Sequence, residues 1–456
     1  MFTRWLSRSP ALRAALAIAF LAAAGYMPTA SAVPAYARQT HQPCTACHIG
    51  GFGPQLTPFG RLFKLGGYTM KAGSQSNLPL SAMLVESYTH TATSQPTPPA
   101  NGFNNNNNLE MQQASIFVAG RLSDHIGMFG QATYSENGGQ LGWDNTEVRY
   151  ARTSMWNGHT LMWGITANNN PTLSDVFNTA PAWQYPYMSS NLAYGPPATP
   201  ALYGAFAGQV VGVTGYSLID NHWYVEGGAY RALSPAFLSD INVGYGGRIS
   251  GLAPYARLAY TSTVKGGDFE IGTTFFDAHR GLPGTDAFGR PYAIPGPTDN
   301  FRDFGVDGSY QFLGTGKHIF TANASYIHEQ QRLNATFASG GSSNLSNSVN
   351  ALNLNGSYWY ENTWGATAGL FRNTGSADAL LYGSANGSPD TSGGIVELNW
   401  NPFGKATSFD EPWINLRLGL QYTFYSKFEG AKNNYDGTGR NASDNNTTYL
   451  YLWTAF

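Results

Sequence analysis

The chain has 456 residues, only 11% of which are charged, and its formal net charge is -2. An ordinary soluble domain carries about 25% charged residues, so the composition excludes a typical soluble enzyme, and the near-neutral balance excludes nucleic acid as a partner. After residue 25 no apolar run approaches the roughly 20 residues of a membrane helix. The abundant glycine (54), tyrosine (27) and phenylalanine (26) instead favour strands of an outer-membrane barrel.

The first 32 residues have the pattern of a secretory signal peptide. A positive region covers residues 4–13, an apolar core covers residues 14–24, and a small-residue cleavage site lies at residues 30–32. We therefore predict that the mature chain begins near Val33 and is exported to the periplasm or the bacterial outer membrane.

The two cysteines both belong to the sequence Cys44-Thr45-Ala46-Cys47-His48. This is the C-x-x-C-H pattern of haem attachment, in which each thiol bonds to a vinyl group and the adjacent histidine binds the iron. No second cysteine pair exists to complete a zinc site. The alternative in an exported chain is a small disulfide loop with an incidental histidine. The pattern predicts one covalent haem c on Cys44 and Cys47, with His48 as its proximal ligand.

The distal ligand of this haem is less defined by the sequence. The nearest histidines and methionines are His41, Met70, Met83 and His90, and we favour Met70. An alternative for each of the four is an ordinary structural role in a loop, a core or a strand. A five-coordinate iron without a distal ligand is a further alternative.

Residues 33–79 are too few to bury a core of their own without a metal, a disulfide or a partner. Their apolar side chains can surround one haem but cannot also form a separate core. We predict that residues 33–79 form a monohaem cytochrome c segment and that it plugs a barrel formed by residues 80–456. The apolar side chains are Phe52, Leu56, Phe59, Leu62, Phe63, Leu65 and Tyr68.

From Leu80 onward, apolar and polar residues alternate in segments of about 10 residues, the length of a tilted strand that crosses an outer membrane. Strands of a soluble sandwich are usually about 5 to 6 residues long. Residues 303–312 and 318–326 show the alternation, and residues 415–424 show it most clearly. There, one face contains Leu416, Leu418, Leu420, Tyr422 and Phe424, and the other contains Asn415, Arg417, Gly419, Gln421 and Thr423.

The sequence contains about 17 such segments, and because bacterial barrels have an even number of strands we predict an antiparallel barrel of about 16. Short connections at residues 123–124, 157–158 and 361–362 predict the periplasmic end, and long ones predict the extracellular end. Between residues 200 and 300 the short and long connections no longer alternate, so we expect one segment in this range not to be a strand of the barrel. Residues 450–456, which end in an aromatic residue, are expected to close the barrel. The segments begin near residues 80, 109, 126, 144, 160, 201, 222, 240, 253, 268, 302, 318, 348, 363, 392, 413 and 447.

A barrel of about 16 strands has a lumen wide enough for water or a plug. Several charged residues are expected to face it, and we interpret them as solvated or mutually paired because polar lumens are general in such barrels. No catalytic group or metal-binding histidine cluster stands out among the nine histidines. The predicted inward charges are Arg121, Glu147, Arg149, Arg257, Asp303, Asp307 and Arg417.

The N-terminal motifs ARQ at residues 37–39, CTACH at 44–48 and LTPFGRLFKLGGYT at 56–69, followed by a porin-like remainder, resemble the fused outer-membrane monohaem cytochrome-porins of iron-oxidising bacteria. This resemblance implies a one-haem segment before a barrel of about 16 strands, with Cys44 and Cys47 attaching the haem and His48 binding its iron. It also implies oxidation of extracellular Fe(II), with the electron passing to a periplasmic cytochrome c or copper protein.

Two functions therefore stay open. A single haem stores a single electron, which matches one-electron donors such as a metal ion, and a barrel through the lipid would insulate the path. The alternative is a solute-conducting porin in which the N-terminal segment is a plug or gate.

Overall fold

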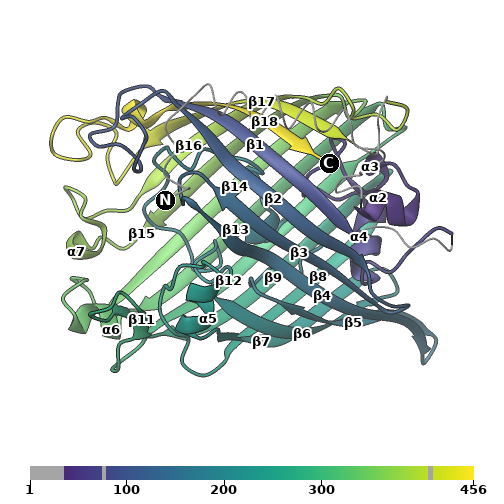
Figure 1. Cartoon of the computed structure of the whole chain (residues 1–456), viewed down its shortest axis with the longest axis horizontal. Coiled ribbons are helices and arrows are strands. Elements are labelled where there is room, and N and C mark those ends of the chain that lie inside the picture. The colour runs from purple at the N-terminus through teal and green to yellow at the C-terminus, as the bar shows by residue number, and fades with distance from the viewer. Residues whose placement is uncertain (1–34, 74–78, 409–413) are drawn as a thin grey trace.

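A computed structural model describes residues 35–73, 79–408 and 414–456, and the predicted signal peptide lies outside these residues. Tilted strands form one closed barrel (Figure 1) of 16 antiparallel strands in which β1 pairs with β18. The predicted all-β barrel and its strand number are confirmed. None of the described helices is long and apolar enough to cross a membrane.

The barrel strands follow the chain in order, and each pairs with its neighbours in sequence except where a small hairpin of β10 (Pro283–Thr285) and β11 (Pro291–Ala293) interrupts them. The barrel strands are β1 (Leu80–Thr91), β2 (Asn108–Arg121), β3 (Ile126–Ser135), β4 (Gln140–Trp156), β5 (His159–Asn168), β6 (Val210–Ile219), β7 (Trp223–Ala232), β8 (Ala253–Val264), β9 (Gly267–Arg280), β12 (Asp299–Phe312), β13 (His318–Arg332), β14 (Ser346–Tyr360), β15 (Trp364–Gly375), β16 (Thr391–Trp400), β17 (Asn415–Lys427) and β18 (Thr447–Ala455).

Short helices lie at both ends of the barrel. The helices α2, α3 and α4 cluster at one end, opposite α6 and α7 (Figure 1). The described helices are α2 (Ala35–Thr40), α3 (Cys44–Cys47), α4 (Pro58–Leu65), η2 (Pro181–Trp183), α5 (Pro235–Asp240), α6 (Asn334–Ala338), α7 (Ala379–Tyr382) and η3 (Ala442–Asn445).

One predicted strand segment is wrong and another is placed too early, and both lie between residues 200 and 300, where we expected the extra segment. The segment near residue 240 is helix α5, which begins because the Ser234 side chain accepts a hydrogen bond from Phe237 N and Pro235 fits the first turn. The segment near residue 201 consists of turns, and β6 starts only at Val210. Its apolar residues pack inside the barrel rather than on the wall, so their pattern imitates a strand.

Alternation gives the wall two different faces. In β17, Leu420 is 47% exposed whereas Arg417 is 3% and Gln421 is 1% exposed. Aromatic side chains such as Trp223 and Trp364 stand on the outer face near the short turns. An apolar outer wall, an aromatic girdle and a polar inner wall are the features of an outer-membrane barrel. The chain therefore spans the outer membrane.

The long connection between β5 and β6, residues 169–209, folds into the barrel instead of extending outward. Its residues 169–180 are all buried, and it contacts the wall on many sides. Gln421 Nε2 of β17 donates to Met188 O at 2.9 Å, and Gln184 Nε2 donates to Ser325 Oγ of β13 at 2.7 Å. Asn373 Nδ2 of β15 donates to Ala198 O at 2.9 Å. This inward loop fills much of the lumen from the long-loop end.

Candidate functional site at the short-turn mouth

The helices α3 and α4 are fixed to each other by the residues between them. Pro43 precedes α3, and Thr57 caps α4, accepting a hydrogen bond from Gly60 N at 3.2 Å. Thr57 N also donates to Cys47 O at 2.9 Å, and Thr57 Oγ1 donates to Ala46 O at 2.5 Å. The first turn of α4 therefore rests on the last turn of α3.

Gly60 makes this close contact possible. A Cβ atom built on Gly60 would lie 2.3 Å from the backbone oxygen of Cys47, which is closer than atoms can approach without moving the backbone. The C-x-x-C-H motif is thus held against α4 by backbone contact as well as by the Thr57 side chain.

The side chains of the motif are largely shielded from water. Cys44 is buried, Cys47 is half-buried, and within the described chain no disulfide joins them. Burial raises the pKa of the Cys47 thiol to about 11. Burial also lowers the pKa of His48 to about 4, so its imidazole is neutral at physiological pH, the form that binds a metal ion.

Several buried polar atoms around the motif have no hydrogen-bond partner among the described residues. They include His48 Nδ1, Gln55 Nε2, and Nε and Nη2 of Arg61. Leaving a buried donor or acceptor unpaired costs about 1–3 kcal/mol, so this cluster is suited to a polar ligand. An imidazole and two thiols are a donor set that fits a haem, whose iron and vinyl groups they match. The buried guanidinium of Arg61 lies 5.4 Å from the ring centre of Phe177 and interacts electrostatically with Glu270, Asp268 and Asp175.

The predicted distal candidates lie in different places. Met70 is 46% exposed at the mouth, and His41 is an exposed residue with a φ of 51°. Met83 is buried in the cluster that contains Phe52 of the N-terminal segment. His90 lies near the long-loop end of β1, where its Nδ1 is 2.8 Å from Asn107 Oδ1. The distal position of Met70 stays a prediction.

Arg417 of β17 joins the N-terminal segment (residues 35–73) to the wall. Its Nη2 donates to Gly50 O at 3.0 Å and to Phe52 O at 2.8 Å. The same guanidinium lies 5.0 Å from the ring centre of Phe52, 5.1 Å from that of Trp359 and 5.4 Å from that of Trp453. Because Arg417 is only 3% exposed, these hydrogen bonds are made away from water and fix the chain just after His48.

Charge complementarity adds to this docking. The N-terminal segment contains four basic residues and no Asp or Glu, whereas the wall and the inward loop supply carboxylates and carbonyls. Tyr68 Oη donates to Glu147 Oε2 at 2.6 Å. Lys64 Nζ donates to Leu173 O at 2.6 Å and to Asp175 O at 2.8 Å, and it lies 4.8 Å from the ring centre of Trp183. The N-terminal segment is therefore bound by both the wall and the inward loop.

The inward charges predicted from the sequence lie on the inner face of the barrel. Arg121 is in phase with the buried Phe117 and Ala119 but lies at the rim, where it forms an ion pair with the exposed Asp124 of the β2–β3 turn. Arg257 lies among three carboxylates, 2.8 Å from Asp307 Oδ1, 3.2 Å from Asp175 Oδ1 and 3.4 Å from Glu270 Oε1. These paired charges hold the inward loop to the wall.

Sequence reasoning missed several residues of this region. Alternation along β9 could have identified Glu270 as inward, since it is in phase with Phe276 on the same face. No alternating pattern in the sequence identifies Asp175, Arg61 or Lys64. Asp175 lies in an irregular loop whose inward fold is not visible in the sequence.

No protein-family model matches the chain, and no curated protein matches it. Among solved structures it is similar to OprB of Pseudomonas putida, at 12% identity over 82% of this chain and 93% of that chain, with a TM-score of 0.48. It is also similar to the outer membrane channel DcaP of Acinetobacter baumannii, at 12% identity over 84% and 100% of the two chains, with a TM-score of 0.44. The outer membrane protein OmpT of Vibrio cholerae matches at 12% identity over 84% and 99%, with a TM-score of 0.41. At this identity the likeness concerns the fold alone.

Proposed function

We propose that this chain is an outer-membrane electron-transfer protein that carries one c-type haem on Cys44 and Cys47. In this proposal extracellular Fe(II) is the electron donor and a periplasmic cytochrome c or copper protein is the acceptor, and a haem held by Cys44 and Cys47 would supply a site for one electron between them. The observation that carries the proposal is the C-x-x-C-H motif, docked at the short-turn mouth of a closed barrel with His48 half-buried and its imidazole neutral. A single haem supplies a one-electron site at that mouth.

Each of the residues around the motif has its own role in this proposal. The thiols of Cys44 and Cys47 would hold the haem covalently, and the His48 imidazole would bind its iron. Arg61 offers a buried guanidinium to a haem carboxylate. Phe52 and Trp453, whose ring centres are 4.9 Å apart in edge contact, exclude water beside His48. The inward loop limits the passage of solutes through the lumen.

An absorption spectrum of purified outer membranes, taken before and after adding Fe(II), tests the proposal. We expect a c-type spectrum that Fe(II) reduces, and we expect Cys44→Ala to abolish haem staining and the Fe(II) response together. Met70→Ala serves as a second variant, because it keeps the attachment site and changes the spectrum only if Met70 is the distal ligand. A colourless protein, or a haem reduced by other donors but not by Fe(II), contradicts the proposal.

A solute-conducting porin is the second candidate, favoured by the closed barrel and its polar inner wall. In this case the N-terminal segment and the inward loop act as a plug or gate. Conductance in planar bilayers separates the two candidates. A porin shows open-channel conductance that the Cys44→Ala variant keeps, whereas a barrel closed to small ions contradicts this second function.

A further inference from the structure

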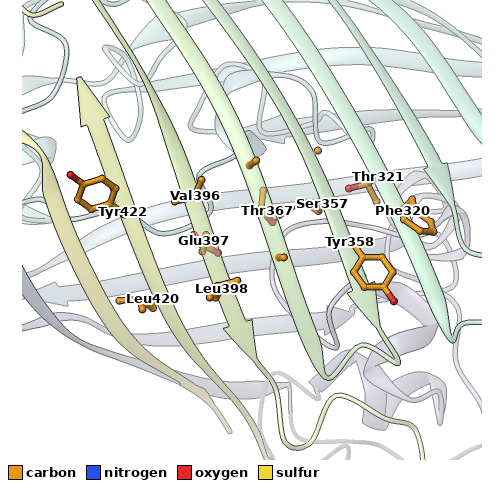
Figure 2. Close-up of a pocket in the computed structure, with 13 residues that line it drawn as sticks. Phe320, Thr321, Ser357, Tyr358, Thr367, Val396, Glu397, Leu398, Leu420 and Tyr422 are labelled. Atoms are coloured by element: carbon orange, nitrogen blue, oxygen red, sulfur yellow. Dashed lines mark hydrogen bonds between the residues drawn. The ribbon is translucent and has the colours of Figure 1, made fainter. Parts of the chain in front are cut away.

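A groove of about 630 Å³ lies on the outer wall, across strands β13 to β17. Its floor is made by small residues, Gly356 of β14 and Ala366 and Ala368 of β15. Figure 2 shows Phe320 and Tyr358 on one side of this floor and side chains of β16 and β17 on the other. The groove is lined almost entirely by apolar atoms and faces the lipid, because it lies on the exposed face of the wall. The outer-face side chains on the second side are Val396, Leu398, Leu420 and Tyr422.

The pairing register places the groove in the middle of the membrane span. One row of paired residues crosses it at Ala368, Val396 and Tyr422. Toward the short turns, the outer face ends in a row with Trp364 and Trp400, whose rings stack with centres 5.9 Å apart. These tryptophans mark the membrane interface on the periplasmic side.

A row of cations lies at the opposite interface. Arg372, Ser392 and Lys427 are paired across β15, β16 and β17. At a rise of about 3.4 Å per residue, Arg372 lies about 14 Å along β15 from Ala368 and about 27 Å from Trp364. At a strand tilt of about 35–45°, the second distance spans about 19–22 Å along the membrane normal, so Arg372 lies within a few Å of the edge of the apolar band of about 25 Å, and its long side chain extends further outward. Arg372 and Lys427 therefore stand at the extracellular surface of the outer leaflet.

These cations are available to a ligand from outside. Arg372 is exposed and has no ion pair with any residue that the structure describes. The side chain of Lys427 is 44% exposed, and its Nζ lies 3.6 Å from Asp390 Oδ2. Guanidinium and ammonium groups bind phosphate strongly when they are placed at a membrane surface.

We propose that this face binds one molecule of lipid A type, a phosphorylated sugar with several acyl chains. One acyl chain fills the groove over Gly356 and Ala368, and a phosphate binds Arg372 and Lys427. A second copy of the chain fits this face less well, because a concave apolar groove needs a protruding partner and the exposed Arg372 at its extracellular end calls for an anion. The proposal is independent of the haem.

Native mass spectrometry of the full chain, extracted from outer membranes in mild detergent, tests the proposal. We expect wild type to retain lipid A, and we expect Ala368→Phe, which fills the groove, and the double variant Arg372→Gln with Lys427→Gln to retain several-fold less. The matched controls are Ala256→Phe and Arg231→Gln, which change exposed outer-face residues of β8 and β7 away from the groove and should leave retention unchanged.

Heat-dependent gel mobility shows whether each variant is folded. A variant that is exported poorly is refolded into phosphatidylcholine vesicles with and without lipid A, and the comparison is repeated there. Equal retention by wild type and all variants overturns the proposal. Retention of phosphatidylglycerol equal to that of lipid A also overturns it. A wild-type mass of two or three chains that becomes the mass of one chain in Ala368→Phe overturns it as well, because the groove would then bind another copy of the chain.

Discussion

Lys64 Nζ donates to the backbone oxygen of Leu173 at 2.6 Å, although Lys64 belongs to α4 at the short-turn mouth and Leu173 to the loop that enters from the opposite end. Leu173 is fully buried, so this hydrogen bond forms inside the barrel. The two elements that occupy the lumen therefore stabilise each other, and loosening one is expected to loosen the other.

Lys64 should make the docking of the N-terminal segment depend on pH. Burial lowers its pKa from the ordinary value of 10.5 to about 8. The undocked segment therefore binds more protons than the docked one between these two values, so docking should strengthen as the pH rises from about 8 to 10.5 and be weakest below 8. Hydrogen exchange of the α4 amides, corrected for intrinsic exchange rates, measures this change.

Lys64→Met is the control for this pH dependence. The variant keeps the length of the side chain but has no titrating group, so its α4 protection should stay level from pH 8 to 10.5. A wild-type profile that is equally level would show that Lys64 is hydrated and not buried between α4 and the inward loop.

Gly60→Ala should weaken the contact between α3 and α4. Alanine is favoured over glycine inside a helix by about 1 kcal/mol, but its Cβ would meet Cys47 O at 2.3 Å. Because the obstacle is backbone, we expect a net loss of about 1–3 kcal/mol, as in other overpacked sites. Hydrogen exchange at residues 44–48 should rise about tenfold per 1.4 kcal/mol lost. In Gly227→Ala, where the nearest atom would be 4.0 Å away, exchange should not change.

The barrel could be predicted from the sequence because its determinant is local. Alternation in β17 directly reports which side chains face lipid, as the opposite exposures of Leu420 and Gln421 confirm. Prediction was wrong near residues 201 and 240, where apolar residues pack inside the lumen or on a short helix. The inward fold of residues 169–209 depends on contacts with β13, β15 and β17 that are far away in the sequence, so no local pattern could reveal it.

The candidate site was predictable only in part for the same reason. The motif at residues 44–48 identifies its chemistry through spacing alone. The partners that position it, Arg417 and Asn362, come from strand β17 and the β14–β15 turn, and Asn362 Oδ1 accepts a hydrogen bond from Gly50 N at 2.8 Å. These pairs are more than 300 residues apart in sequence, and only the closed barrel brings them together.

Arg61→Gln should lower the reduction potential of the proposed haem. A buried cation near the haem carboxylates favours the reduced state, which carries one positive charge fewer, and glutamine removes that cation. Arg61→Lys should keep most of the effect. Spectroelectrochemical titration of the purified protein measures the potential, and the ratio of haem to protein shows whether attachment is intact. Potentials that agree among the three proteins would mean that Arg61 points away from the haem, toward the carboxylates of β9.

Removing the carboxylates of Asp303 and Glu329 should open the lumen. Glu329 Oε2 accepts a hydrogen bond from Ala201 N at 2.6 Å, and Asp303 Oδ2 accepts one from Leu202 N at 2.9 Å. Both carboxylates are fully buried, and each of these hydrogen bonds contributes about 0.5–1.5 kcal/mol. In Asp303→Ala with Glu329→Ala, these two amides lose their acceptors, and this part of the inward loop loses its attachment to β12 and β13.

We therefore expect the double variant to conduct ions more often or at a larger single-channel conductance than wild type in planar bilayers. Glu226→Ala is the control, since this buried lumen carboxylate binds only Thr214 and Tyr224 of the wall, and its loss changes charge without releasing the loop. If wild type and double variant conduct equally, the inward loop does not obstruct the pore. The solute-conducting function would then need no gate at this position.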